Sequence, residues 1–258
     1  MKRRKFIKAT AATSMALSTL PMVGCSILKG EKAFSLIQIL QLKGFNDEQE
    51  EIPSLVADGS GQMWMYALRR VSYPENAELV SAFHFDGKNW TETDSVSKSA
   101  GQYEAPVATC ATGGKPVVAW TEKKEEDWVI NVAMMKANGM SDPYTFPVKS
   151  GRSINPVLIA PDKNRNWIAW ENLHEGKFTI YISKYENGQW SEPVIIDKGE
   201  NSCFDPGIVE DKNGDLYIAY GLTEGFHQNI EMTIIDGETL KIKKFIPVAI
   251  GGGHKNRV

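Results

Sequence analysis

Apolar residues recur at every second position in several short segments of the chain. The clearest are Ile130, Val132 and Met134, then Ile180 and Ile182, then Ile230, Met232 and Ile234. A period of two is that of a β-strand with one face buried. Later turns carry Asp86-Gly87, Asn138-Gly139, Asn187-Gly188 and Asp236-Gly237, the dipeptides that most strongly signal a tight hairpin. The pattern therefore predicts antiparallel strands joined by short turns.

These segments belong to an internal repeat marked by prolines. Pro53, Pro106, Pro156 and Pro206 follow one another at spacings of 53, 50 and 50 residues. Each precedes a short apolar run and a turn rich in Asp, Asn or Gly. Trp120, Trp170 and Tyr220 stand 14 residues after their prolines, and Tyr66 is the matching aromatic residue of the first repeat, one position earlier. A period of about fifty residues indicates tandem structural units.

Each unit has room for four strands, the fourth expected at residues 91–96, 144–148, 193–196 and 242–248. Tandem four-stranded units are the sequence signature of an all-β propeller, in which each antiparallel sheet, or blade, packs on its neighbours. A β-sandwich would need more residues per unit, and a β-solenoid coil fewer. We predict a propeller domain over residues 34–258, with blades at about 53–100, 101–150, 151–200 and 201–250.

The two ends of this domain bear on its completeness. Residues 34–42 read as an outermost strand, and residues 251–258 resemble the connection that precedes a further blade. We therefore expect four repeats of an incomplete or open propeller, with unpaired edges that aggregate or need a partner. The alternative is a closed ring of four blades, with the strand at 34–42 added outside the fourth.

The first 24 residues read as a signal peptide. A cationic start precedes an apolar stretch, residues 9–23, that is too short to span a bilayer. Arg3 and Arg4, followed by Lys-Phe-Ile-Lys, resemble the twin-arginine export signal, with an ordinary secretory signal as the alternative. Met-Val-Gly before Cys25 resembles a lipobox, which implies lipidation of Cys25 and a tether at 25–33, the alternative being a chance cysteine.

These features predict an exported lipoprotein whose partner is a membrane, held through its anchor. Ser26 resembles the outer-membrane sorting class, so in a Gram-negative cell we expect the outer membrane or periplasmic face. Without residues 1–24 the chain has 24 basic and 32 acidic residues, a net charge of about −8 that disfavours nucleic acid. Beyond the anchor only Cys110 and Cys203 remain, and we interpret both as small buried residues, with a disulfide between them as the alternative.

The repeat, which ends in Asn-Gly-Gln-Trp-Ser-Glu-Pro at residues 187–193, resembles the blades of sialidase-like and TolB-like propellers. Two departures from the sialidase pattern bear on function. The Asp-box-like segment at 58–64 occupies the first turn of its unit and lacks the leading serine. The Arg-Ile-Pro motif reads Glu51-Ile52-Pro53, so an acid replaces the arginine that would hold a sialic-acid carboxylate.

Propellers usually bind ligands on the face where the blade connections and the loops between second and third strands meet. On that face we expect ligand-binding candidates Arg69, Arg70, Tyr103, Arg152, His174 and His227. Glu122 and Glu171, which follow Trp120 and Trp170, are the candidates for paired catalytic carboxylates, although solvated loop acids explain them as well. The tryptophans suit either core packing or sugar stacking. No metal-ligand spacing or cofactor motif is present in the sequence.

The sequence thus leaves two functions open. The first is a non-catalytic propeller that binds a glycan or an envelope protein through its loop face. The alternative is a carbohydrate-active enzyme, either a sialidase-like glycoside hydrolase or a polysaccharide lyase, using Glu122, Glu171, Arg69 and Arg152. We expect binding without catalysis, because the sialidase arginine is replaced. Convergence of both arginines and two carboxylates on one pocket would favour the enzyme.

Overall fold

The structure is a computed structural model that describes residues 50–72, 77–111, 113–147, 151–225 and 227–249. The chain divides into two units at residue 38, and all described residues belong to the second. Their regular elements are β-strands throughout, with no helix in these ranges. The signal peptide with Arg3 and Arg4, Cys25, the tether and the expected strand at 34–42 lie outside the described residues, as do residues 250–258.

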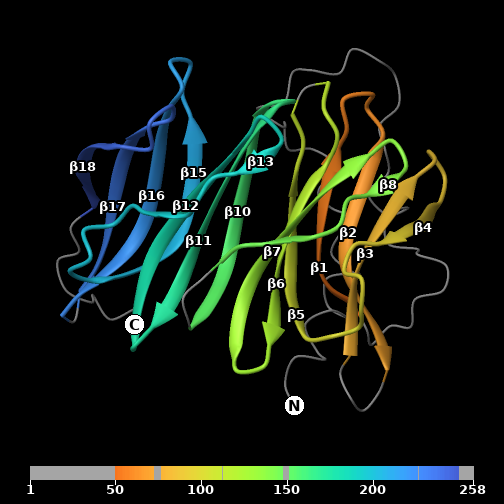
Figure 1. Cartoon of the computed structure of the whole chain (residues 1–258), viewed down its shortest axis with the longest axis horizontal. Helices are drawn as coiled ribbons and strands as arrows, with labels where there is room; N and C mark the ends of the chain where they lie inside the picture. The colour runs from red at the N-terminus through yellow and green to blue at the C-terminus, as the bar shows by residue number, and fades with distance from the viewer. Residues whose placement is uncertain (1–49, 73–76, 112, 148–150, 226, 250–258) are drawn as a thin grey trace, which may run out of the picture. The chain divides into compact units, whose positions relative to one another are not determined.

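Four antiparallel sheets follow one another along the chain (Figure 1). Sheet 1 contains β1 (Glu50–Ala57), β2 (Met63–Ser72), β3 (Ala77–Phe85) and β4 (Trp90–Ser95) in that order. Sheet 4 repeats this order with β15 (Ser202–Glu210), β16 (Asp215–Glu224), β17 (His227–Asp236) and β18 (Ile242–Ala249). Sheets 1 and 4 are meanders in which every strand pairs with the next, as the hairpin signals predicted.

Sheets 2 and 3 have the same plan with a divided fourth strand. Sheet 2 contains β5 (Tyr103–Thr109), β6 (Val117–Lys124), β7 (Asp127–Lys136), β8 (Gly139–Met140) and β9 (Tyr144–Thr145). Sheet 3 contains β10 (Arg152–Asp162), β11 (Arg165–His174), β12 (Lys177–Glu186), β13 (Gln189–Trp190) and β14 (Val194–Ile195). A single parallel pair, Arg152 with Trp128, joins β10 to β7. Pro143 and Pro193 fall between the two pieces and have no N–H to donate to a ladder.

Turn chemistry is local and follows the residue types. Asn187 and Gly188 both have positive φ, 54° and 87°, as a two-residue hairpin turn requires. At the end of β3, Oδ1 of Asp86 accepts hydrogen bonds from the backbone N–H groups of Lys88 and Asn89, both at 2.7 Å. These turns therefore form for the reason that their sequences predict.

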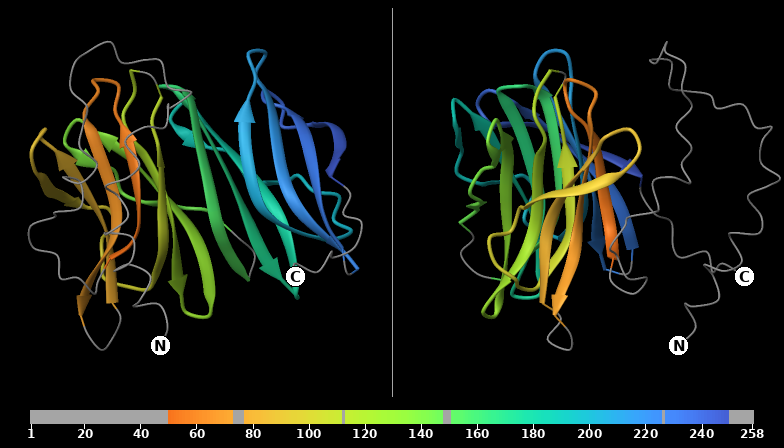
Figure 2. Two further views of the ribbon diagram at one scale, coloured as in Figure 1. Left: turned by 180° about the vertical axis from the view of Figure 1, so that it is seen from behind. Right: turned by 90° about the vertical axis from the view of Figure 1, so that its right-hand side faces the viewer.

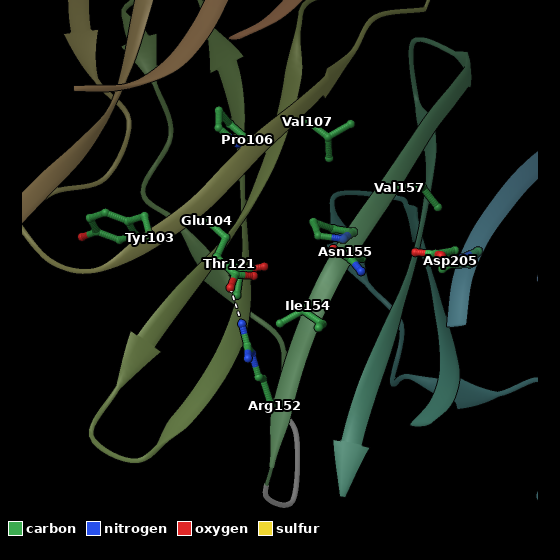
Figure 3. A pocket seen from close by; sticks show the side chains of 12 residues that line it. Tyr103, Glu104, Pro106, Val107, Thr121, Arg152, Ile154, Asn155, Val157 and Asp205 are labelled. Atoms are coloured by element: carbon green, nitrogen blue, oxygen red, sulfur yellow. Dashed lines mark hydrogen bonds and ion pairs between the residues drawn. The ribbon is translucent and has the colours of Figure 1, made fainter. Parts of the chain in front are cut away.

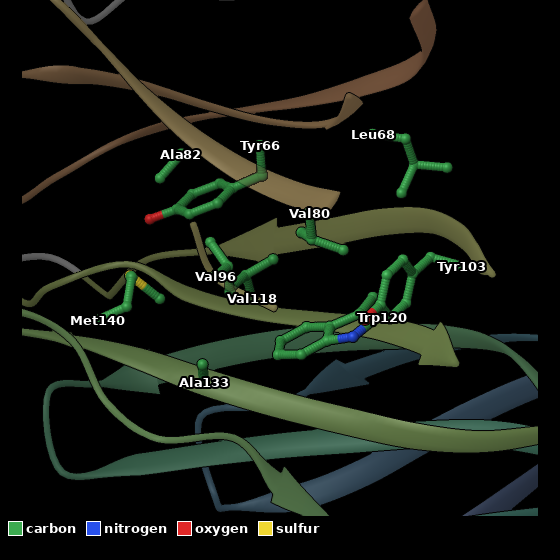
Figure 4. Packing of buried hydrophobic residues seen from close by; sticks show 10 residues of the cluster. All are labelled: Tyr66, Leu68, Val80, Ala82, Val96, Tyr103, Val118, Trp120, Ala133 and Met140. Atoms are coloured by element: carbon green, nitrogen blue, oxygen red, sulfur yellow. The ribbon is translucent and has the colours of Figure 1, made fainter. Parts of the chain in front are cut away.

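The sheets pack face to face, and alternate side chains of the middle strands fill the spaces between them. Between sheets 1 and 2, Tyr66, Val80, Val118 and Trp120 are at most 1% exposed (Figure 4). Trp170 packs in the same way on sheet 2, and Tyr220 on sheet 3. Burial of each such large side chain contributes about 1.5–3 kcal/mol. The aromatic residues of the repeat are therefore core residues.

Tyr66 is not the structural counterpart of Trp120, contrary to the sequence alignment. The residue opposite Tyr66 on β1 is Ser54, which directly follows Pro53, and the matching residue of β6 is Ala119, opposite Val107. Tyr66 therefore points toward the following sheet, whereas Trp120 points toward the preceding one. A shift of one residue moves a strand side chain to the other face, so the two rings meet in one interface from opposite sides.

Sheets 1 and 4 lie at opposite ends of the row (Figures 1 and 2). No hydrogen-bonded strand pair joins them among the described residues, so a closed ring is not observed in this part of the chain. Sheet 4 has exposed apolar side chains at Val209, Ile230 and Val248, which are 58%, 44% and 55% exposed. Ile180, which stands where Ile230 stands in its own repeat, is completely buried against sheet 4.

Candidate ligand-binding site

The first strands of sheets 2, 3 and 4 surround a cavity of about 630 Å³ (Figure 3). Its polar side chains are Tyr103, Glu104, Thr121, Arg152, Asn155 and Asp205. They come from β5, β6, β10 and β15, which are far apart in the sequence. The cavity is therefore made by the packing of successive sheets.

A bulge at the repeated proline shapes each wall of this cavity. The strand register shifts between Glu104 and Val107, between Ile154 and Val157, and between Phe204 and Gly207. Each shift contains Pro106, Pro156 or Pro206, all of which line the cavity. Proline cannot donate to the ladder, so the strand accommodates it as a bulge that re-aims the neighbouring side chains.

Asn155 and Asp205, which precede two of these prolines, both adopt a φ of 52°. This left-handed conformation is uncommon for residues with a side chain, and Asn and Asp tolerate it best. Holding it costs about 1–3 kcal/mol per residue, so the surrounding structure must stabilise it. The strain lies in the cavity wall, where both residues present polar groups.

Arg152 connects sheets 2 and 3 at the cavity. Its guanidinium forms an ion pair with Glu104 at 2.5 Å (Figure 3) and lies 5.0 Å from the centroid of the Trp128 ring. The Arg152 and Glu104 side chains are 45% and 33% exposed, so solvent screens the pair and it contributes about 0–1 kcal/mol. The two groups therefore remain available to exchange part of this contact for a ligand.

Glu171 lies behind the wall and is only 3% exposed. Its carboxylate accepts a hydrogen bond from Nδ2 of Asn155 and another from the backbone N–H of Asp205, the latter at 2.9 Å. Burial raises the pKa of Glu171, although these two hydrogen bonds and the positive charge of Arg152 oppose the rise. Both carboxylate oxygens are thus occupied in holding Asn155 and Asp205.

Glu122 occupies a different position from Glu171. It accepts a hydrogen bond from Nδ2 of Asn131 at 2.7 Å and lies 3.4 Å from Nζ of Lys124. Thr121, which directly follows Trp120, is the residue that matches Glu171, and it lines the cavity. Since neighbouring strand residues point to opposite faces, Glu122 and Glu171 do not face one another.

The other residues singled out from the sequence lie outside the cavity, except Tyr103 and Arg152. Arg69 donates from Nε to Glu92 at 3.0 Å, and Arg70 lies 3.9 Å from Glu78. His174 ends β11 and His227 begins β17, and both are exposed. The structure therefore brings Tyr103 and Arg152 together with Glu104 and Asp205, and places Arg69, Arg70 and the two histidines elsewhere.

Sequence reasoning missed Asn155 and Thr121 as wall residues. The signal for Asn155 was its position directly before a repeated proline, which Asp205 shares. The Tyr103 hydroxyl donates to the backbone oxygen of Ser99 at 2.6 Å, and its ring is buried in the core between sheets 1 and 2, so Tyr103 closes one end of the cavity.

Cys110 and Cys203 are free thiols, and burial raises the pKa of both, that of Cys203 to about 12. No group of three or more His, Cys, Asp or Glu side chains suited to a metal ion occurs in the described ranges. In the same part of the chain, no helix is long and apolar enough to cross a membrane.

No protein-family model matches the sequence, and no curated protein is significantly similar to it. Among solved structures, the chain is similar to an α-L-arabinofuranosidase from Fusarium graminearum, with a TM-score of 0.51, 10% identity, and coverage of 74% of this chain and 64% of the other. An endo-arabinase from Bacteroides thetaiotaomicron has a TM-score of 0.50 and 12% identity, over 80% of this chain and 82% of its own.

An ulvan lyase, solved with a bound sulfated saccharide, has a TM-score of 0.54 and 11% identity, over 80% of this chain and 58% of its own. The chain thus spans less than two thirds of the length of the arabinofuranosidase and of the lyase. These similarities show an all-β fold of antiparallel four-stranded sheets like those of arabinofuranosidase, arabinase and lyase β-propellers. At such identities they show the fold alone.

Proposed function

We propose that this chain is an exported, lipid-anchored β-propeller protein that binds a neutral glycan in the cavity between β5, β10 and β15. The observation that carries the proposal is the set of polar groups in one cavity, namely Glu104, Asn155 and Asp205. Carboxylates and amides are acceptors and donors for sugar hydroxyls. Val107, Ile154, Val157 and the proline rings provide the apolar surface that a sugar ring face contacts.

The charge of the cavity supports a neutral ligand over an acidic one. Two carboxylates, Glu104 and Asp205, accompany one guanidinium, and Arg152 is already paired with Glu104. A ligand carboxylate would add a third negative charge to this group, and like charges repel. The replacement of the sialidase arginine by Glu51 agrees with this choice.

Binding is measured by titration calorimetry of the full chain against neutral oligosaccharides, including arabino-, galacto- and gluco-oligomers. Asp205→Asn is the most informative variant, because Asn tolerates the left-handed φ while the charge is lost. We expect Asp205→Asn and Glu104→Gln each to weaken binding about 10- to 150-fold, since a hydrogen bond to a charged group contributes about 1.5–3 kcal/mol. Glu238→Gln, at an exposed turn, is the matched control.

Unchanged affinity in both cavity variants would contradict the assignment of the site. The protein could also bind none of the neutral oligosaccharides but bind a purified envelope protein, with that binding lost in Asp205→Asn. This outcome would show that the ligand is a protein and not a glycan.

A carbohydrate-active enzyme is the second candidate, and two carboxylates in the same cavity favour it. A glycoside hydrolase needs two carboxyl groups on either side of the scissile bond. Glu104 and Asp205 fit this requirement better than Glu122 or Glu171, because both line the cavity. Turnover of glycosides or polyuronides by the full chain, lost in Asp205→Asn but kept in Glu238→Gln, would establish the enzyme.

A further inference from the structure

A second cavity, of about 610 Å³, lies between sheets 2 and 3 at the other end of β10. Asp162, the last residue of β10, lines it, whereas Arg152, the first residue, lines the cavity described above. A strand rises about 3.3 Å per residue, so these two ends are roughly 30 Å apart. The two cavities are therefore separate sites.

Three lysines give this second cavity a positive rim. Lys115, Lys136 and Lys163 line it, and all three are exposed. Lys136 and Lys163 form no ion pair within the described residues, and Lys115 lies 3.6 Å from Asp58. The acid of the cavity, Asp162, pairs with Arg165 at 3.3 Å. The rim therefore carries uncompensated positive charge.

Asn166 is an independent sign of a polar ligand. Asn166 lines the cavity and is only 5% exposed. Its side-chain amide has no hydrogen-bond partner among the described residues. It lies two residues before Ile168, whose side chain packs on sheet 2, so the amide points to the same side. The amide is therefore available to hydrogen-bond a ligand group in the cavity.

The remaining walls suit a ring with one apolar face. Met134, Val117 and the ring of Tyr185 supply apolar surface. Gly113 and Gly188, at φ values of 72° and 87°, form turns without side chains that would fill the space. Apolar walls, one amide and several cations match a sugar ring that carries a carboxylate or sulfate.

We propose that this cavity binds an acidic saccharide, with Asn166 contacting a ring oxygen or hydroxyl and Lys136 and Lys163 contacting the anionic group. This proposal is independent of the neutral-glycan site at the other end of β10. The full chain is titrated with oligogalacturonate, with a sulfated oligosaccharide, with a neutral galacto-oligosaccharide of the same length, and with inorganic sulfate. We expect the acidic saccharides to bind at least tenfold more tightly than the neutral one and than sulfate.

The variants distinguish specific binding in this cavity from nonspecific electrostatic attraction to surface lysines. Lys136→Gln with Lys163→Gln should weaken acidic-saccharide binding at least tenfold, and Asn166→Ser about three- to tenfold. Lys212→Gln is the matched control, since Lys212 occupies the same turn position in sheet 4 as Lys163 and lies outside the cavity. Asp205→Asn should leave this binding unchanged, which distinguishes it from the first site.

Equal losses in Lys212→Gln and in the double variant would overturn the proposal in favour of nonspecific attraction. Inorganic sulfate that binds as tightly as the saccharides would restrict the site to a simple anion and overturn the saccharide assignment. Circular dichroism of each variant shows whether the fold is kept, and Lys136→Gln alone serves if Asn166→Ser does not fold.

Discussion

The carboxylate of Glu171 in sheet 3 accepts a hydrogen bond from the backbone N–H of Asp205 in sheet 4, at 2.9 Å. Asp205 has a positive φ and directly precedes Pro206 in a bulge. One buried acid therefore holds the strained backbone of the next sheet. This contact links the packing of the core to the shape of the candidate site.

Glu171→Gln should destabilise the protein by about 1–3 kcal/mol, because the Gln amide has a single acceptor oxygen for two donors. The effect should depend on pH. Burial raises the pKa of Glu171 in the folded state, so ionisation favours the unfolded state, and the contribution of Glu171 to stability falls as pH rises above its ordinary pKa of 4.5.

The gap in unfolding free energy between wild type and Glu171→Gln, measured by urea denaturation, should therefore be larger at pH 4.5 than at pH 7.5. Glu122→Gln, outside this contact, is the control for loss of a carboxylate on a neighbouring sheet. A gap that widens with pH would mean that Glu171 is stabilised in its charged form.

Asp58→Asn should destabilise sheet 1 by about 1–3 kcal/mol at neutral pH. Burial alone would raise the pKa of Asp58, but hydrogen bonds from Ser60, Gln62 and Trp64 lower it to about 2. A lowered folded-state pKa means stability that is present above the ordinary value of 3.8 and lost as pH falls toward 2.

Urea denaturation at pH 7, 4 and 3 should show an Asp58→Asn deficit that is largest at pH 7, begins to fall near pH 4 and is clearly smaller at pH 3. Asp211→Asn changes the corresponding turn of sheet 4 and serves as a comparison. A deficit that grows on acidification would contradict the charged hydrogen-bonded turn.

Trp167→Phe should lower the free energy of unfolding more than Trp170→Phe, although both side chains lie on β11 and are completely buried. Nε1 of Trp167 donates to Oε2 of Glu210 in sheet 4 at 2.6 Å, whereas Nε1 of Trp170 has no partner among the described residues. Both substitutions lose similar volume, but only Trp167→Phe removes a donor from a buried carboxylate.

We expect the unfolding free energies of Trp167→Phe and Trp170→Phe to differ by about 1–3 kcal/mol. Trp167→Phe combined with Glu210→Ala gives the double-mutant cycle that isolates this contact. Equal losses in the two single variants would mean that ring packing alone determines the effect.

Cys25→Ala tests the anchor proposed from the lipobox-like sequence. The variant should be released from membranes or keep its signal peptide, since roughly 0.8 kcal/mol for each buried CH₂ of the acyl chains would be lost. Membrane fractionation with mass spectrometry of the mature N-terminus measures this. Cys110→Ala is the control, and a fully processed Cys25→Ala protein still in the membrane fraction would exclude lipidation there.

Arg3→Lys with Arg4→Lys tests the export route. The double variant keeps the positive charge of the signal, so a general secretory signal should still work, whereas twin-arginine export should stop. The precursor and mature forms are separated by pulse labelling. Lys2→Arg is the control, and undiminished export of the double variant would remove the twin-arginine proposal.

The sequence by itself determined the strands and their turns. Alternation at residues such as Ile180 and Ile182, and pairs such as Asn187-Gly188, act within a few residues, because side-chain period and turn dihedrals are local properties. The repeated prolines marked the first strand of each sheet for the same reason. These local signals suffice for an all-β chain of four-stranded sheets.

The tertiary structure alone decided which side chains meet. Glu171 and Asp205 are brought together only when sheets 3 and 4 pack, and nothing near either residue in the sequence specifies that contact. Tyr66 lies 13 rather than 14 residues after its proline and so occupies the opposite face from Trp120, and only the packing of sheets 1 and 2 shows that the two rings share one interface. Both candidate cavities lie between sheets, so their composition depends on long-range packing that local periodicity does not encode.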